Sequence, residues 1–127
     1  MQISNSRNAA SLDGSWEKLY AAGRQVSRYP FGELVSYVLR LYGKALSDGT
    51  QLRALELGSG CGNNLAFLAR EGFEAHGVEG SPSACESARA HLAAQSLTAS
   101  IVQADFIRLP YPDAHFDLIV DRAAVYA

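Results

Sequence analysis

A short apolar run that ends in closely spaced glycines constrains the fold of this chain more than any other feature. Residues 52–57 have the length and composition of a buried strand, and they lead directly into Gly58-Ser59-Gly60-Cys61-Gly62. A helical pattern follows, with Leu65 and Leu68 on one face and Gly72 where the pattern stops. Three alternating glycines between a strand and a helix predict a sharp turn with positive φ angles, whose backbone can approach a ligand closely.

The alternation of strand and helix continues beyond this turn. The apolar patterns predict further strands over residues 75–79, 101–104 and 116–121. A helix is expected after the first of these, with Ser81 as its N-cap, Pro82 at its first position and an end near residue 95. Strands that alternate with helices form parallel sheets with right-handed crossovers. The predicted fold class is therefore α/β, with a doubly wound, mostly parallel sheet.

The part of the chain ahead of the glycine turn has a helical character. Leu34, Val38, Leu39 and Leu46 belong to an apolar stripe that predicts a helix after Pro30. A shorter helix is expected over residues 13–23, and the polar residues before it are expected to form a loose terminus. We therefore divide the chain into a helical lead-in over residues 1–49 and a ligand-binding α/β core over residues 50–127.

Composition excludes several classes of protein. The 127 residues are enough for one core, and 48% hydrophobic with 19% charged residues argues against disorder. The net charge is −2, without a basic stripe or an apolar span, so neither nucleic acid nor a membrane is an expected partner. The polar start does not have the pattern of a secretory signal, and Cys61 and Cys85 stand in no metal-ligand spacing. We expect a cytoplasmic protein with two buried thiols and no metal site.

The spacing of the glycines discriminates between ligand classes. The dinucleotide fingerprint GxGxxG needs a third glycine at position 63 or 65, where the chain has Asn63 and Leu65. A phosphate-binding P-loop needs a lysine that is absent here. What remains is Glu56-x-Gly-x-Gly-x-Gly at the end of the first core strand. This pattern resembles the first motif of the class I S-adenosylmethionine-dependent methyltransferases.

Three later segments support the resemblance in the expected order. Glu79 ends the second core strand, where a carboxylate can accept hydrogen bonds from both hydroxyls of a ribose. As a strand-end carboxylate, it is expected to lie outside the core. Asp105 and Phe106 follow the third core strand, and residues 109–120 are similar to the stretch that leads into the family's fourth strand. The resemblance covers about residues 50–122 and implies a Rossmann-like methyltransferase topology.

The resemblance also implies roles for individual residues. Gly58, Gly60 and Gly62 would back the methionine part of S-adenosylmethionine, the implied cofactor. Glu56 would lie near its amino group, and Glu79 would hold its ribose.

Further contacts are implied at the ends of the later strands. Asp105 would accept from the adenine amine, and Phe106 would present its backbone N–H to the ring. Asp121, at the end of the fourth core strand, is the one candidate for a catalytic base. Additional cofactor contacts are expected from Ser59, Asn63, Gly80, Ser81 and, in an aromatic lid formed by the lead-in, Tyr29.

The expected function is methyl transfer to an acceptor that the sequence does not identify, with a small molecule preferred. Two alternatives stay open: a non-catalytic methyltransferase-like binding module, and a fragment of an NAD(P)-binding oxidoreductase. The sheet of this family continues beyond four strands, so we expect an incomplete, N-terminal cofactor-binding part. Residues 116–120 would then form an unpaired, apolar strand edge, through which the isolated chain is expected to self-associate or aggregate.

Overall fold

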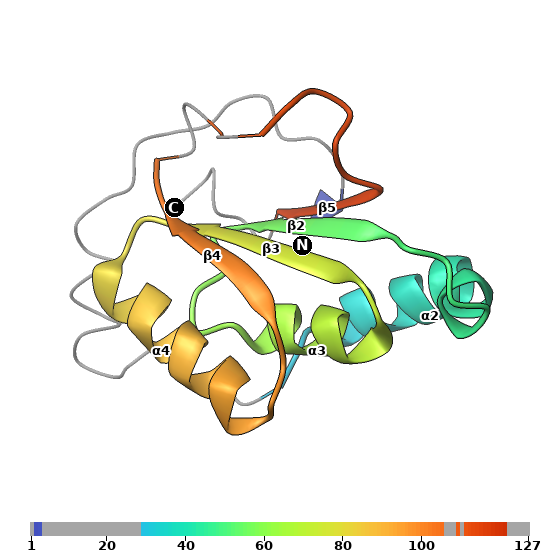
Figure 1. Cartoon of the computed structure of the whole chain (residues 1–127), viewed down its shortest axis with the longest axis horizontal. Coiled ribbons are helices and arrows are strands. Elements are labelled where there is room, and N and C mark those ends of the chain that lie inside the picture. Colours follow the sequence, from blue (N-terminus) through green and yellow to red (C-terminus); the bar gives the residue numbers. More distant parts are fainter. Residues whose placement is uncertain (1, 4–28, 106–108, 110, 122–127) are drawn as a thin grey trace.

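A single mixed sheet organises the described part of the chain. The computed structural model describes residues 2–3, 29–105, 109 and 111–121. Its strands are β1 (Gln2–Ile3), β2 (Arg53–Leu57), β3 (Glu74–Glu79), β4 (Ala99–Gln103) and β5 (Leu118–Asp121). They lie in the order β1-β5-β2-β3-β4 (Figure 1), and β5, β2, β3 and β4 are mutually parallel. The predicted α/β class with a Rossmann-like, mostly parallel sheet is confirmed.

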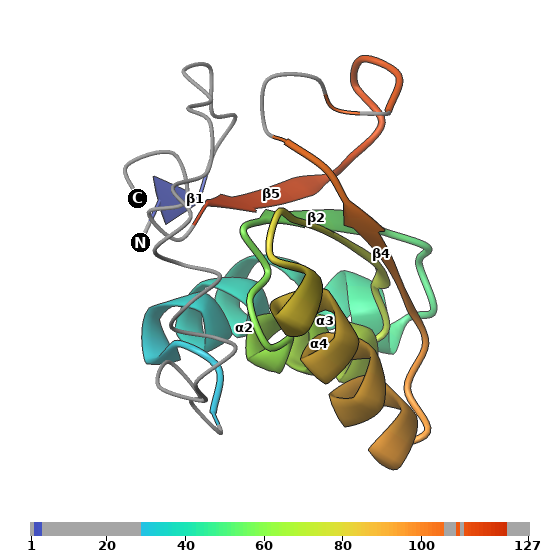
Figure 2. The same ribbon diagram turned by 90° about the vertical axis from the view of Figure 1, so that its left-hand side faces the viewer.

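Helices cover one face of this sheet. The described helices are α2 (Gly32–Ser47), α3 (Asn63–Glu71) and α4 (Pro82–Ala94). Both views place all three on the same side of the strands, while the segment that leads into β5 passes over the opposite side (Figures 1 and 2). Glycines with positive φ follow two of the helices: Gly49 (φ 81°) lies just after α2, and Gly72 closes α3 with φ 111°. The helix expected over residues 13–23 lies outside the described residues.

The main core lies between the helices and the sheet. Leu34 and Val38 of α2 and Leu65 and Leu68 of α3 are fully buried in it. They pack against strand residues that point to the helix face, namely Ala54, Ala75, Leu118 and Val120. Leu39, placed in the apolar stripe of α2 by its spacing, is exposed instead. The lead-in helix thus shares its core with the ligand-binding part of the chain.

A second, smaller cluster covers the opposite face of the sheet. Leu55, Leu57 and Val78 point to this face and pack against Tyr111 and Phe116. The aromatic rings of Tyr111 and Phe116 lie 4.9 Å apart in an edge-to-face arrangement. Tyr111 and Phe116, from the connection between β4 and β5, therefore cover this face of the sheet, whereas helices cover the other face.

The edge of β5 differs from the sequence expectation. Residues 116–120 were expected to present an unpaired edge, but β1 pairs with β5 in antiparallel orientation, with Gln2 opposite Asp121 and Ile3 opposite Val120. The start of the chain is therefore not a loose terminus at these two positions. The described pairing covers the expected edge at Val120, and at Asp121 beside it, while Leu118 and Ile119 lie outside the register of β1. In the part of the chain that the structure describes, no helix is both long and apolar enough to cross a membrane.

Candidate functional site

The strand register brings the predicted site residues to one edge of the sheet. Leu57 at the end of β2 lies opposite Val78 of β3 on one side and Asp121 of β5 on the other. Glu79, the last residue of β3, lies opposite Gln103, the last residue of β4. The carboxyl ends of all four parallel strands therefore meet at this edge, where open α/β sheets bind their ligands.

The glycine turn between β2 and α3 has the geometry that its sequence predicts. The φ angles of Gly58, Gly60 and Gly62 are 69°, 56° and 87°, all in the left-handed region. The N–H groups of Gly58 and Ser59 both donate to the carbonyl of Val78, at 2.8 and 3.3 Å. The turn is thereby fastened to β3 before the chain enters α3.

Two glycines near this edge are required by packing, and for Gly62 this requirement adds to its positive φ. A Cβ on Gly62 would lie 3.0 Å from the Cβ of Ala88 in α4. The space around Gly62 is therefore taken by a helix, which adds a packing role to the ligand role that the resemblance implies. A Cβ on Gly77 would lie 2.6 Å from Leu65 and 2.9 Å from the Ser59 hydroxyl oxygen. Ser59 thus packs its side chain against the backbone of β3.

Glu79 is the central carboxylate of this edge. It is only 3% exposed, so the expectation that it lies outside the core is wrong. Its Oε1 accepts from the backbone N–H of Gly60 at 2.8 Å, and its Oε2 accepts from the N–H of Ser81 at 2.9 Å. One side chain therefore joins the glycine turn to the start of α4. Each oxygen keeps further acceptor capacity toward a ligand hydroxyl.

A second buried carboxylate lies on β2. Glu56 is 1% exposed, and its Oε2 accepts from Nδ2 of Asn64, near the start of α3, at 2.7 Å. The sequence analysis placed Glu56 in the site but gave Asn64 no role. A signal was present, because Asn64 lies one turn ahead of Leu68 and next to Leu65, on the buried face of α3.

The remaining predicted residues fall into different surroundings. Ser81 caps α4, as predicted, with its hydroxyl accepting from the N–H of Ala84 at 3.1 Å. Asp121 is fully buried at the end of β5. Asp105 follows β4 with an exposed side chain, and Tyr29 is 75% exposed ahead of α2. Asn63 begins α3 and Gly80 follows β3, both half-buried, and Phe106 lies outside the described residues.

The two cysteines flank Glu79. Burial raises the pKa of the Cys61 thiol, and the nearby negative charge of Glu79 raises it further. Cys85 in α4 is buried and donates its S–H to the backbone carbonyl of Glu79 at 3.5 Å. Neither cysteine forms a disulfide, and Cys61 is half-buried rather than buried. The surroundings of Cys61 favour a neutral thiol over a reactive thiolate.

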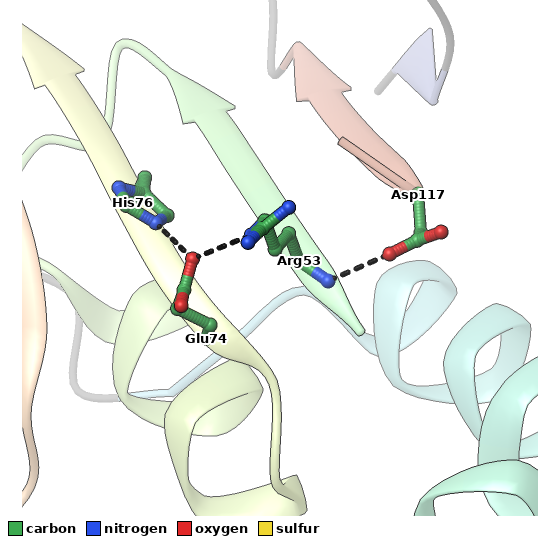
Figure 3. A network of polar contacts seen from close by, with 4 residues as sticks. All are labelled: Arg53, Glu74, His76 and Asp117. Carbon is green, nitrogen blue, oxygen red and sulfur yellow. Dashed lines mark hydrogen bonds and ion pairs between the residues drawn. The ribbon is translucent and has the colours of Figure 1, made fainter. Parts of the chain in front are cut away.

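A polar network occupies the other end of β3 (Figure 3). Oε2 of Glu74 accepts from Nε of Arg53 at 3.0 Å and lies 2.9 Å from Nε2 of His76. The hydrogen bond from His76 lowers the pKa of the Glu74 carboxyl, and the contact with Arg53 adds to this effect. Asp117 fixes the start of β2 by accepting from the Arg53 backbone N–H at 2.8 Å. Among the described residues, no group of three or more His, Cys, Asp or Glu side chains is placed to hold a metal ion.

Comparison with known proteins gives a consistent set of matches. A family model described as a methyltransferase domain matches residues 54–127. The chain is similar to a protein-L-isoaspartate O-methyltransferase of Methylorubrum extorquens (strain PA1), with 38% identity over 96 residues, covering 73% of this chain and 42% of that protein.

Two solved structures are similar as well. One is the T. thermophilus 16S rRNA N2 G1207 methyltransferase in complex with AdoMet and guanosine, with 29% sequence identity and a TM-score of 0.57. The match covers 69% of this chain and 23% of the T. thermophilus chain. The other is an S-adenosylmethionine-dependent methyltransferase from Clostridium acetobutylicum ATCC 824, with 22% sequence identity and a TM-score of 0.55. The match covers 84% of this chain and 40% of the C. acetobutylicum chain. The chain spans less than half the length of each of these relatives.

Proposed function

Since this chain belongs to the class I S-adenosylmethionine-dependent methyltransferases, as the match to the methyltransferase domain family shows, we propose that it is the cofactor-binding part of an enzyme. The enzyme would transfer a methyl group to a small molecule. The family predicted from the sequence motifs is confirmed by this match. The observation that carries the proposal is Glu79, a buried carboxylate tied to the glycine turn and to the start of α4.

The residues present fit S-adenosylmethionine as the cofactor. The ligand carries a ribose with two hydroxyls, and the Glu79 carboxylate offers acceptor capacity at the end of β3, beside the left-handed glycine turn. S-adenosylmethionine also carries positive charges on its sulfonium and ammonium groups. These charges suit the carboxyl edge of the sheet, which also holds the buried carboxylate of Glu56. No described Lys or Arg forms an ion pair with Glu79, so no basic side chain competes with a ligand for this carboxyl group.

The protein's part in the reaction is to bind and to orient. The chemistry that the cofactor supplies when bound is an electrophilic methyl group on a sulfonium. Gly58 and Gly60 let the backbone approach the cofactor closely, Glu79 holds the ribose, and Glu56 holds the amino group. This placement turns a bimolecular displacement into a positioned one. Asp121, fully buried at the end of β5, is the proposed base for the acceptor's proton.

A small-molecule acceptor is supported by the charge of the chain. The net charge of −2 gives no electrostatic attraction for a phosphate backbone. We expect radiolabel from S-adenosylmethionine to appear in the low-mass fraction of a cell extract. Label in the RNA or protein fraction would overturn the acceptor class.

The cofactor assignment is tested by titration calorimetry. S-adenosylhomocysteine, which has the cofactor's ribose, adenine and amino acid, is expected to bind the 127-residue chain, whereas NADH is not. Binding of NADH alone would favour the oxidoreductase alternative. Binding of S-adenosylhomocysteine without label transfer to any fraction would favour a non-catalytic binding module.

A further inference from the structure

Asn64 places a polar side chain in the packed interior between the lead-in and the cofactor edge. It is the second residue of α3 and only 5% exposed. Its Nδ2 donates to Oε2 of Glu56 at 2.7 Å, and its Oδ1 accepts from the backbone N–H of Phe31 at 2.9 Å. One amide therefore connects Glu56 of β2 with Phe31, which lies 33 residues before Asn64 in the chain.

The chemistry of the two partners fixes the orientation of this amide. A backbone N–H can only donate, and an ionised carboxylate can only accept. The carbonyl of Asn64 must therefore face Phe31 and its amino group must face Glu56, so flipping the amide would break both contacts. A buried amide without its partners costs free energy that an apolar residue in the same place would not.

Phe31 is the point where the lead-in becomes helical. It is the N-cap of α2, with φ −65° and ψ 130°, and its carbonyl accepts from the N–H of Val35 at 3.1 Å. Its ring packs against the main core beside Leu34 and Val38 of α2. Holding the Phe31 N–H thus fixes the backbone at the start of α2.

We infer that Asn64 is a positioning residue that sets the orientation of the Glu56 carboxylate and, through the same amide, seats the lead-in at Phe31. Binding at Glu56 and seating of the lead-in are coupled because they share one side chain. A change in the contact between Asn64 and Glu56 therefore alters the hydrogen bond at Phe31, and a change at Phe31 alters the contact with Glu56. The inference rests on the proposed function only in placing Glu56 beside the cofactor.

The two contacts of the amide can be separated by substitution. Asn64→Asp keeps an acceptor for Phe31 but sets a second carboxylate oxygen against Glu56 Oε2, where two negative charges repel. Adding Glu56→Gln supplies an amino group that donates to the new carboxylate. The double variant restores the bond in the reverse direction and keeps the net charge of the wild type.

The direct readout is the hydrogen-exchange rate of the Phe31 amide, followed by NMR in the ligand-free chain. We expect Asn64→Asp to speed this exchange at least about tenfold, because repulsion between the two carboxylates moves the side chain at position 64 away from the Phe31 N–H. The double variant should return close to the wild-type rate. Gln51→Glu, the same chemical change at an exposed position, is the matched control and should leave the rate unchanged.

Two results would overturn the coupling. One is an unchanged Phe31 exchange rate in Asn64→Asp, which would make the two contacts independent. The other is a double variant that exchanges as fast as the single variant or faster, because a merely space-filling role would add the two defects rather than cancel them.

Calorimetry with S-adenosylhomocysteine on the same variants tests the proposed function separately from the positioning role of Asn64. Glu56→Gln and the double variant should both bind at least about tenfold more weakly, because the carboxylate at the ligand's amino group is gone. Full affinity in the double variant would remove Glu56 from the cofactor contact while the exchange data still support Asn64. A wild-type chain that does not bind the ligand would contradict the proposed function, and the exchange rates would still decide the positioning role.

Discussion

The two ends of β3 carry glutamates in opposite surroundings. Glu79, at the carboxyl end, is buried and accepts from the backbone N–H groups of Gly60 and Ser81. Glu74, at the amino end, has a half-exposed side chain and pairs with Arg53 and His76 (Figure 3). The two carboxylates share a strand but differ in solvent access and in the kind of donor they meet.

The difference separates a surface ion pair from a ligand site. The Arg53 guanidinium pairs with Glu74, and such exposed pairs contribute little to the free energy of unfolding. Backbone N–H groups donate to both oxygens of Glu79, and no described basic side chain pairs with it. A buried carboxyl group with such partners at the carboxyl end of a parallel sheet is suited to binding hydroxyl groups, whereas Glu74 is suited to joining two strands.

The largest effect is expected from the glycines that flank α3. Gly62 and Gly72 both have positive φ, but a Cβ on Gly62 meets Ala88 at 3.0 Å, whereas one on Gly72 meets only Leu46 at 3.7 Å. Gly72→Ala adds backbone strain of about 1–2 kcal/mol. Gly62→Ala adds similar strain and about 1–3 kcal/mol of overpacking. Chemical denaturation should therefore show a lower free energy of unfolding for Gly62→Ala.

Gly77→Ala sharpens this prediction, because a Cβ there clashes with Leu65 and Ser59 without a positive φ. The free energy of unfolding of Gly77→Ala should lie between those of Gly62→Ala and Gly72→Ala. Equal losses for Gly62→Ala and Gly72→Ala would mean that α4 moves away at no cost, and the tight packing of this edge would be contradicted.

Much of the cofactor edge could be predicted from the sequence because its signals are local. Alternating glycines after an apolar run require positive φ whatever lies around them, and Ser81-Pro82 determines the start of α4 by its own chemistry. The parallel orientation of β5, β2 and β3 follows from the alternation of strands and helices, whereas their order in the sheet is implied by the resemblance to the methyltransferase family.

The rest depends on contacts between distant segments. The pairing of β1 with β5 involves two residues, too few for any periodicity to show. The role of Asn64 depends on the path of the chain at Phe31, and the burial of Glu79 depends on the turn that folds over it. Leu39 has the right spacing for burial in α2, but the helix is covered on one side only.

A smaller effect concerns Cys61, which senses the charge of Glu79. Burial and that charge both raise the pKa of the Cys61 thiol, so iodoacetamide at pH 8 should alkylate it more slowly than in the urea-unfolded chain. Glu79→Gln removes the second cause and should speed alkylation of the folded protein, measured by peptide mass spectrometry. Glu74→Gln, at the other end of β3, should not change the rate, and an equal acceleration in both variants would break the comparison.

The smallest effect is the pH dependence of the Glu74 pair. The pKa of Glu74 is lowered in the folded chain from its usual 4.5, so its contribution to stability is present above that value and is lost as the pH falls through the folded-state pKa. The melting temperatures of wild type and Glu74→Gln should differ slightly at pH 6 and converge as the pH falls below the folded-state pKa of Glu74. A difference that widens as the pH falls would contradict the sign of this shift.

The affinity of S-adenosylhomocysteine for two matched variants tests the central claim most directly. Glu79→Gln and Glu74→Gln make the same chemical change on the same strand, and circular dichroism first establishes that both variants are folded. The account predicts that calorimetry finds at least about tenfold weaker binding for Glu79→Gln and wild-type binding for Glu74→Gln. Wild-type affinity in a folded Glu79→Gln variant, or equal weakening in both variants, would contradict the assignment of the carboxyl end of β3 to the cofactor.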